Sequence, residues 1–376
     1  NITLYLRVLS VSVFFVSFNA VYLAILMKKM QFRKIMIIGI ASSISAGIVG
    51  VVLAYVGFGV WSLIIQQILS SFLQSVLLVI WVKWKYALHF SRTSASFILK
   101  YGGTISVAAI IDNLYYDVES LFVGKWFSQN LLGYYTNART YPLRVISSVK
   151  DTISGVVFPA MSKVAGNVAE VKKLAKLSIR LFSFVVFPAM IGLALIAEEF
   201  VLILLTEKWL PIVFPMQMFC LAFAFLSISS PNIQVIKSLG KAKMNLIIEI
   251  VRKAMILCTL ILVVLVFNTI DAVAIGFAIS NIITAIGVAA VCGHQIGYEL
   301  IEQFRDMLKN IVSLIIMILA ITLIHIILPS DCLGLMSMIL KIIVGGVIYI
   351  SSALLLKNPI ITMVMEKLGK KGMVEQ

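Results

Sequence analysis

Long apolar runs, each about as long as a bilayer is thick, constrain this chain more than any other feature. A helix needs about 20 consecutive apolar residues to cross the hydrocarbon core, and about eleven such runs follow one another here. They lie at 4–26, 35–56, 58–82, 97–123, 137–160, 177–197, 212–236, 246–267, 270–293, 308–328 and 333–356. Strands of a membrane barrel would alternate polar and apolar residues instead. The sequence therefore predicts an all-α polytopic membrane protein.

Composition supports the same class. Hydrophobic residues make up 61% of the chain and charged residues 12%, whereas soluble domains carry about 25% charged residues. This excludes a water-soluble enzyme, a disordered chain and a disulfide scaffold. The three histidines are scattered, the four cysteines lack zinc-site spacing, and no phosphate-binding loop occurs. We therefore expect no catalytic residue, no metal site and no cofactor, and hence not an enzyme.

The basic residues are distributed unequally between alternate loops. About twenty of the Lys and Arg side chains fall in one set of loops, and only Lys125 and Lys208 fall in the other. Because basic loops stay in the cytoplasm, we expect a multi-pass protein with a cytoplasmic C-terminus. The formal charge of +15 is then membrane-surface charge and does not indicate nucleic-acid binding. The first span would begin outside, so we expect an odd number of preceding helices.

Two neighbouring spans carry charges at mid-membrane depth, where ionisable groups are costly and usually face a bundle interior or a water-filled cavity. At 100° per residue, each set of polar residues forms one narrow stripe. The candidate residues on the two spans are Asp112, Tyr116 and Glu119, and Asn137, Tyr141, Arg144, Ser148 and Asp151.

These charges allow two interpretations. Arg144 and Asp112 lie at similar depths and could form an ion pair that locks two helices together. Alternatively, they line a solvated cavity that offers Arg to an anion and carboxylates to protons or sugars. Arg139 and Lys150 lie on the opposite face, near the ends of the span, where reaching toward the interface explains them.

The polar intervals suggest an organisation. Residues 83–96 divide the first three spans from the rest and predict a linker, so the expected domains are 1–92, 93–293 and 294–376. A short amphipathic cytoplasmic helix is predicted at 162–176. On a later span, the spacing of Glu249 and Arg252 favours an internal salt bridge.

Four segments carry a family resemblance: LAYVGFGVWSLIIQQ at 53–67, LGYYTNARTYPLRV at 132–145, VVFPAMSKV at 156–164 and TEKWLPIVFPMQM at 206–218. They resemble polysaccharide exporters and O-antigen flippases of the multidrug/oligosaccharidyl-lipid/polysaccharide (MOP) superfamily. The resemblance implies a MATE-like fold, with two helical bundles around a central cavity. The first three spans would end the first bundle, whose three N-terminal helices would be missing. The next six would form the second bundle, and the last two an additional pair.

The resemblance also implies a function: a flippase that exports undecaprenyl-pyrophosphate-linked oligosaccharide by alternating access. Arg144 would bind the pyrophosphate, because Arg offers a fork of donors to phosphate oxygens. Asp112, Glu119 and Asp151 would offset charge, bind sugar hydroxyls or carry protons. Further expected partners are membrane lipids and a coupling ion, either proton or sodium. The alternatives are a drug/cation antiporter of the same superfamily and a membrane-embedded polysaccharide polymerase or ligase.

Overall fold

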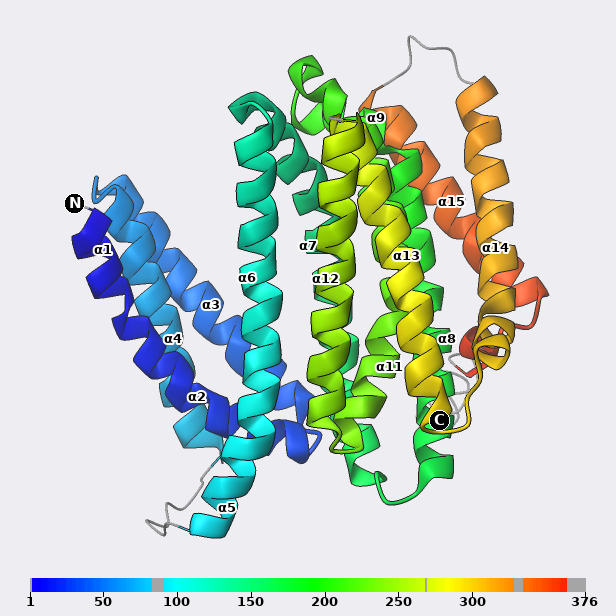
Figure 1. The fold of residues 1–376 in the computed structure, drawn as a ribbon. Helices are drawn as coiled ribbons and strands as arrows, with labels where there is room; N and C mark the ends of the chain where they lie inside the picture. The colour runs from blue at the N-terminus through cyan, green and yellow to red at the C-terminus, as the bar shows by residue number, and fades with distance from the viewer. Residues whose placement is uncertain (1, 83–90, 268, 328–333, 364–376) are drawn as a thin grey trace, which may run out of the picture. The chain divides into compact units, whose positions relative to one another are not determined.

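The computed structural model describes residues 2–82, 91–267, 269–327 and 334–363, and every long element within them is a helix (Figure 1). Contacts divide the chain into two units, Asn1–Ser91 and Arg92–Gln376. Most of the predicted linker, at 83–90, lies outside the described residues.

The first unit consists of α1 (Ile2–Leu9), α2 (Val11–Lys28), α3 (Phe32–Tyr55) and α4 (Val60–Val82). Helix α4 packs against both α2 and α3, around a small core formed by Tyr22, Leu26, Ile38 and Leu78. The buried Asn19 on α2 donates to the backbone of α4 at Ser71. Such interhelical hydrogen bonds support helix association in a medium where apolar burial drives little.

The second unit contains the remaining helices and the larger core. They are α5 (Arg92–Phe97), η1 (Ile98–Gly102), α6 (Gly103–Trp126), α7 (Gln129–Lys163), α8 (Val168–Leu195), α9 (Ala197–Leu204), η2 (Glu207–Ile212), α10 (Val213–Ala224), α11 (Leu226–Ser238), α12 (Ala242–Phe267), α13 (Ile270–His294), α14 (Leu300–Ile327) and α15 (Leu335–Leu355). Helix α8 is the most central, because it packs against α7, α10, α11 and α14. The helices predicted as an additional C-terminal pair, α14 and α15, belong to this unit.

Ten stretches of the described residues are helical, long and apolar enough to cross a membrane, and the chain is an all-α, multi-pass membrane protein. The predicted span at 137–160 is the exception. It lies within α7, a helix of 35 residues that is long enough to cross a membrane but is not among these ten stretches.

Side-chain caps fix where several helices begin. Ser128 accepts from the Leu131 amide at the start of α7, and Asn167 accepts from two amides at the start of α8. The cap at Asn167 corrects one prediction. The predicted separate helix at 162–176 does not exist, because α7 continues to Lys163 and α8 begins at Val168. The amphipathic pattern there belongs to the first turns of α8, which bury Val171.

A buried ion pair attaches α15 to the rest of the second unit. Lys341 on α15 donates to Glu199 on α9, and both side chains are 1% exposed. The Lys341 ammonium also lies 3.0 Å from Nδ1 of His325 on α14. Further along, the Tyr349 hydroxyl donates to the backbone of α8 at Phe184. The pair α14–α15 is therefore held by specific polar contacts as well as by apolar packing.

Candidate functional site

Two neighbouring cavities lie inside the second unit, one lined by α6, α7, α11 and α12 and the other by α7, α10, α11, α12 and α13. The larger has a volume of about 140 Å³ and the smaller about 90 Å³. They share Lys150, Leu226 and Arg252 as a common wall. Basic side chains on their combined lining are Arg139, Lys150, Lys237, Arg252 and Lys253, and acidic ones are Asp151 and Glu249. This charged interior is the candidate functional site.

Helix α7 supplies the cavities from its inward face, which we define as Arg139, Ser147 and Lys150. Arg139 is 6% exposed, and its guanidinium lies 5.3 Å from the centre of the Phe277 ring on α13. The prediction that Arg139 reaches toward the membrane interface is therefore wrong. A cation–π contact inside the unit holds this side chain instead. Lys150 is half-buried and lines both cavities.

Helix α12 contributes an ion pair that the sequence spacing predicted. Arg252 donates to Glu249 over 2.6 Å, and both side chains are largely buried. The next residue, Lys253, is also buried and lines the smaller cavity. One turn before Glu249, the buried Asn245 lines the larger cavity. A wide strip of α12 is thus polar and faces inward, although the helix as a whole is strongly apolar.

Helix α11 completes the larger cavity with uncharged polar groups. Ser229, Ser230 and Gln234 line it. The continuous apolar stretch at 207–238 is divided at Phe225, where α10 ends and α11 begins. Two residues after the cavity serines, Asn232 donates to Gln303 of α14 over 2.9 Å.

The predicted site residues on α7 lie on a different face, which we call the exposed face: Arg144, Ser148 and Asp151. All three are exposed, and the Ser148 hydroxyl donates to the Arg144 carbonyl within the helix. Asp151 also reaches the rim of the smaller cavity. The structure therefore separates the predicted stripe from most of the cavity lining.

Two other predicted residues on α7 have local structural contacts. The Asn137 side chain donates to the Gly133 carbonyl one turn earlier. The Tyr141 ring packs edge-on against the Phe200 ring of α9, with the ring centres 5.4 Å apart. Both side chains are half-buried. Neither is among the residues that line the two cavities.

The predicted stripe on α6 lies on a helix that the structure confirms. The side chains of Asp112, Tyr116 and Glu119, however, lie outside the described residues. The pairing of Asp112 with Arg144 therefore stays a prediction. Earlier in the chain, in η1, the Tyr101 hydroxyl donates to the Lys237 carbonyl over 2.6 Å, which ties the segment before α6 to the end of α11.

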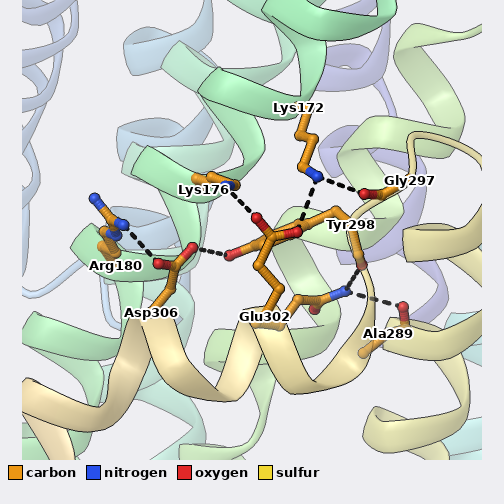
Figure 2. A network of polar contacts seen from close by, with 9 residues as sticks. Lys172, Lys176, Arg180, Ala289, Gly297, Tyr298, Glu302 and Asp306 are labelled. Carbon is orange, nitrogen blue, oxygen red and sulfur yellow. Dashed lines mark hydrogen bonds and ion pairs between the residues drawn. The ribbon is translucent and has the colours of Figure 1, made fainter.

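A second polar network, which we call the α8–α14 clasp, joins the beginnings of these two helices (Figure 2). Lys172 and Lys176 both pair with Glu302, and Arg180 pairs with Asp306 over 2.5 Å. The Tyr298 hydroxyl donates to Asp306 over 2.6 Å. Burial, and then this hydrogen bond, raise the pKa of Tyr298 above its ordinary value, so the hydroxyl remains a donor. All basic groups of the clasp face acidic partners, which indicates a structural role.

Close backbone packing fixes the loop that precedes α14. A Cβ on Gly293 would lie 2.2 Å from the Tyr298 carbonyl oxygen, so only glycine fits there. The Gln303 amide donates to that carbonyl and to the Ala289 carbonyl. The loop, the end of α13 and the start of α14 therefore form one rigid connection.

Sequence reasoning missed the inward face of α7 and the polar groups of α11 and α12 as parts of one site. The separation between Arg139 and Lys150 was the available signal, because it corresponds to about three helical turns and places both on one face. Within the part of the chain that the structure describes, no group of three His, Cys, Asp or Glu residues could hold a metal ion.

Fold and site together define a polytopic helical membrane protein with a charged interior. A family model described as "Polysaccharide biosynthesis protein" matches residues 1–214. The chain belongs to this family.

Curated relatives are consistent with this family. An uncharacterized membrane protein in the cps region of Klebsiella pneumoniae is 25% identical over 259 residues, which is 68% of this chain and 53% of that protein. Lipopolysaccharide biosynthesis protein WzxC of Escherichia coli (strain K12) is 24% identical over 234 residues, which is 60% of this chain and 46% of that protein. Succinoglycan biosynthesis transport protein ExoT of Rhizobium meliloti is 22% identical over a region that is 50% of this chain and 38% of that protein. The chain spans about half the length of the curated relatives it matches.

Solved structures agree on the fold. The crystal structure of a MATE point mutant superposes with a TM-score of 0.69 at 18% identity, covering 78% of this chain and 69% of that chain. The lipid II flippase MurJ in an inward closed conformation gives a TM-score of 0.63 at 16% identity. The match covers 95% of this chain and 74% of that chain. These likenesses confirm the predicted MATE-like fold.

Proposed function

We propose that the protein takes part in moving a lipid-linked saccharide across the membrane, as a flippase that works by alternating access between two helical bundles. The family match over residues 1–214 carries this proposal. The names of two relatives, a lipopolysaccharide biosynthesis protein and a succinoglycan transport protein, point to saccharide cargo. The cargo would be a polyprenyl-pyrophosphate-linked O-antigen, capsule or exopolysaccharide unit.

The exposed face of α7 supplies the group we assign to the pyrophosphate. Arg144 is exposed on a helix whose other side packs into the unit. A guanidinium presents several parallel donors to phosphate oxygens, so it suits this cargo better than an ammonium. Asp112, Glu119 and Asp151 would contact sugar hydroxyls or carry a coupling proton, with Tyr116, Tyr141, Asn137 and Ser148 beside them. Sodium is the other candidate coupling ion.

Two rival functions predict different chemistry. A drug/cation antiporter needs acidic or aromatic groups where its cargo binds, whereas exposed Arg144 and the basic cavity lining favour an anionic cargo. A polymerase or ligase needs a nucleophile or general base that reaches its substrate. Such an enzyme would be expected to present a long outer loop with catalytic His or Arg residues, whereas the predicted outer loops of this chain are short and nearly free of charge.

Orientation follows from the loop charges and is also a proposal. With basic loops in the cytoplasm of a bacterial inner membrane, cysteines introduced at Ser128 and Thr269 should react with an impermeant maleimide from outside. Cysteines introduced at Ser162 and Lys241 should be protected in intact cells. Outside labelling at Lys241 would overturn the orientation.

Deletion of the gene at its native locus tests the function. The expected result is loss of surface polysaccharide, with lipid-linked saccharide accumulating on the cytoplasmic leaflet. Accumulation on the outer leaflet would indicate a polymerase or ligase instead. Normal polysaccharide together with a changed drug susceptibility would favour the antiporter.

A further inference from the structure

We propose that the larger interior cavity of the second unit binds one sugar ring that carries an anionic oxygen group, such as a sugar phosphate or a uronic acid. The inference deepens the proposed function, on which it rests for the origin of the ligand. It concerns a site separate from Arg144, because Arg144 is not among the residues that line this cavity.

The size of the cavity sets the first limit. Its volume is about 140 Å³. A buried water needs about 10–15 Å³ of such space, so the cavity has room for roughly ten waters and therefore for one hexose ring. A longer glycan would have to extend beyond the lining residues.

Two buried polar side chains on the cavity wall have atoms that no group among the described residues satisfies. They are Oγ of Ser229 on α11 and Oδ1 of Asn245 on α12, and each residue is 2% exposed. A buried polar atom without a partner costs free energy, and a ligand or water normally satisfies it. Because one atom is a hydroxyl and the other an amide oxygen, they suit a ligand whose hydroxyls both donate and accept. Sugar hydroxyls have this property.

The charge of the lining selects among hydroxylated ligands. The Lys150 ammonium on α7 borders the cavity, and no described residue accepts a hydrogen bond from it. Glu249 is the acidic residue among the described lining residues, and it is already paired with Arg252. A metal cation is disfavoured beside Lys150, Lys237 and Arg252. An anionic oxygen group attached to the ring would instead satisfy Lys150.

The remaining wall is aliphatic. Ile105 and Ala109 of α6, with Leu226 and Ile233 of α11, line the same space. The C–H face of a pyranose ring can pack against such side chains while its hydroxyls reach the serine and asparagine. This division of the wall distinguishes a sugar site from a simple anion site, which would not need an apolar surface.

Calorimetric titration of the purified protein in nanodiscs tests the proposal with four compounds: glucose 1-phosphate, glucuronate, glucose and inorganic phosphate. We expect glucose 1-phosphate or glucuronate to bind about tenfold more tightly than glucose or phosphate, because only they engage both the ammonium and the hydroxyl-binding atoms. Tighter binding of glucose 1-phosphate would identify the sugar next to the pyrophosphate. Tighter binding of glucuronate would identify an acidic sugar of the glycan.

Variants assign the binding to this cavity. Lys150→Gln should weaken the charged sugars about tenfold while leaving glucose nearly unchanged, and Lys150→Arg should retain binding. Ser229→Ala should weaken all three sugars and leave phosphate unchanged. Lys125→Gln and Ser337→Ala serve as matched controls, because these residues lie on α6 and α15, away from the cavity lining. Unchanged affinity in Lys150→Gln and Ser229→Ala would overturn the proposal, as would phosphate binding as tightly as glucose 1-phosphate.

Binding and translocation are measured separately, so the two proposals can fail separately. Export that persists in a protein that binds none of the sugars would sink only the cavity assignment. Sugar binding in a protein whose deletion leaves export intact would sink only the flippase.

Discussion

The two faces of α7 carry arginines only a few residues apart, yet their environments are opposite. On the inward face, Arg139 is buried against the Phe277 ring, and Lys150 borders two cavities. On the exposed face, Arg144, Ser148 and Asp151 have open surroundings. A buried cation that is already packed is costly to move or remove, whereas an exposed one is available to bind a ligand. The comparison predicts that Arg139 stabilises the fold, whereas Arg144 is available for the proposed contact with the pyrophosphate.

The largest effect is expected from Arg139→Ala. The substitution removes a desolvated cation–π contact worth about 2 kcal/mol and leaves a void in the second unit. Thermal unfolding in nanodiscs and cellular abundance should both show a clear loss of stability. Arg144→Ala is the matched control on the exposed face, where we expect a change within about 0.5 kcal/mol. Equal loss of stability in the two variants would break the comparison.

An intermediate effect is expected at the Glu249–Arg252 pair, whose side chains are largely buried. Arg252→Met leaves the Glu249 carboxylate without this partner, so it should destabilise the protein more than the double variant Glu249→Gln, Arg252→Met does. A double-mutant cycle should give a coupling of about 1–2 kcal/mol, within the range for contacting residues. Additive effects would mean that the pair contributes nothing to the inward-facing site.

The smallest effect is expected in the α8–α14 clasp at Glu302, whose side chain is 35% exposed. Although Glu302 pairs with both Lys172 and Lys176, water and salt screen such pairs. Glu302→Gln should therefore cost at most about 1 kcal/mol, with the difference shrinking at high ionic strength. A loss as large as that of Arg139→Ala would show that exposure is a poor guide to the energetics of this protein.

The helices could be predicted from sequence because the length of an apolar run is a direct physical requirement for crossing a membrane. Boundaries set by single residues were harder. The amphipathic pattern at 162–176 suggested an independent helix, whereas the Asn167 cap joins most of it to α8. Hydrophobic periodicity reports which face is buried, and it does not report where one helix stops and another begins.

The site was only partly predictable. The i,i+3 spacing identified the Glu249–Arg252 pair, because both partners lie on one helix. Arg139 was misjudged because its partner, Phe277, is remote in sequence and an aromatic ring gives no charge signal. Ser229 and Asn245 are polar, but the sequence alone does not show that α11 and α12 bring them to one cavity. Contacts between distant helices determine these roles, and a single sequence does not encode them in any local pattern.

The most direct test of the central claim compares single and double substitutions at Arg144 and Asp112, introduced at the native locus. Protein abundance and the leaflet distribution of lipid-linked saccharide are measured together. If Arg144 binds the pyrophosphate, the Arg144→Ala, Asp112→Ala double variant should be made at normal abundance while export stays at least about tenfold reduced, because the charge-assisted contact to cargo is lost. Arg144→Lys should be intermediate, since it keeps the charge without the fork of donors. Normal export by a well-folded double variant would contradict the account and leave Arg144 and Asp112 as a structural pair.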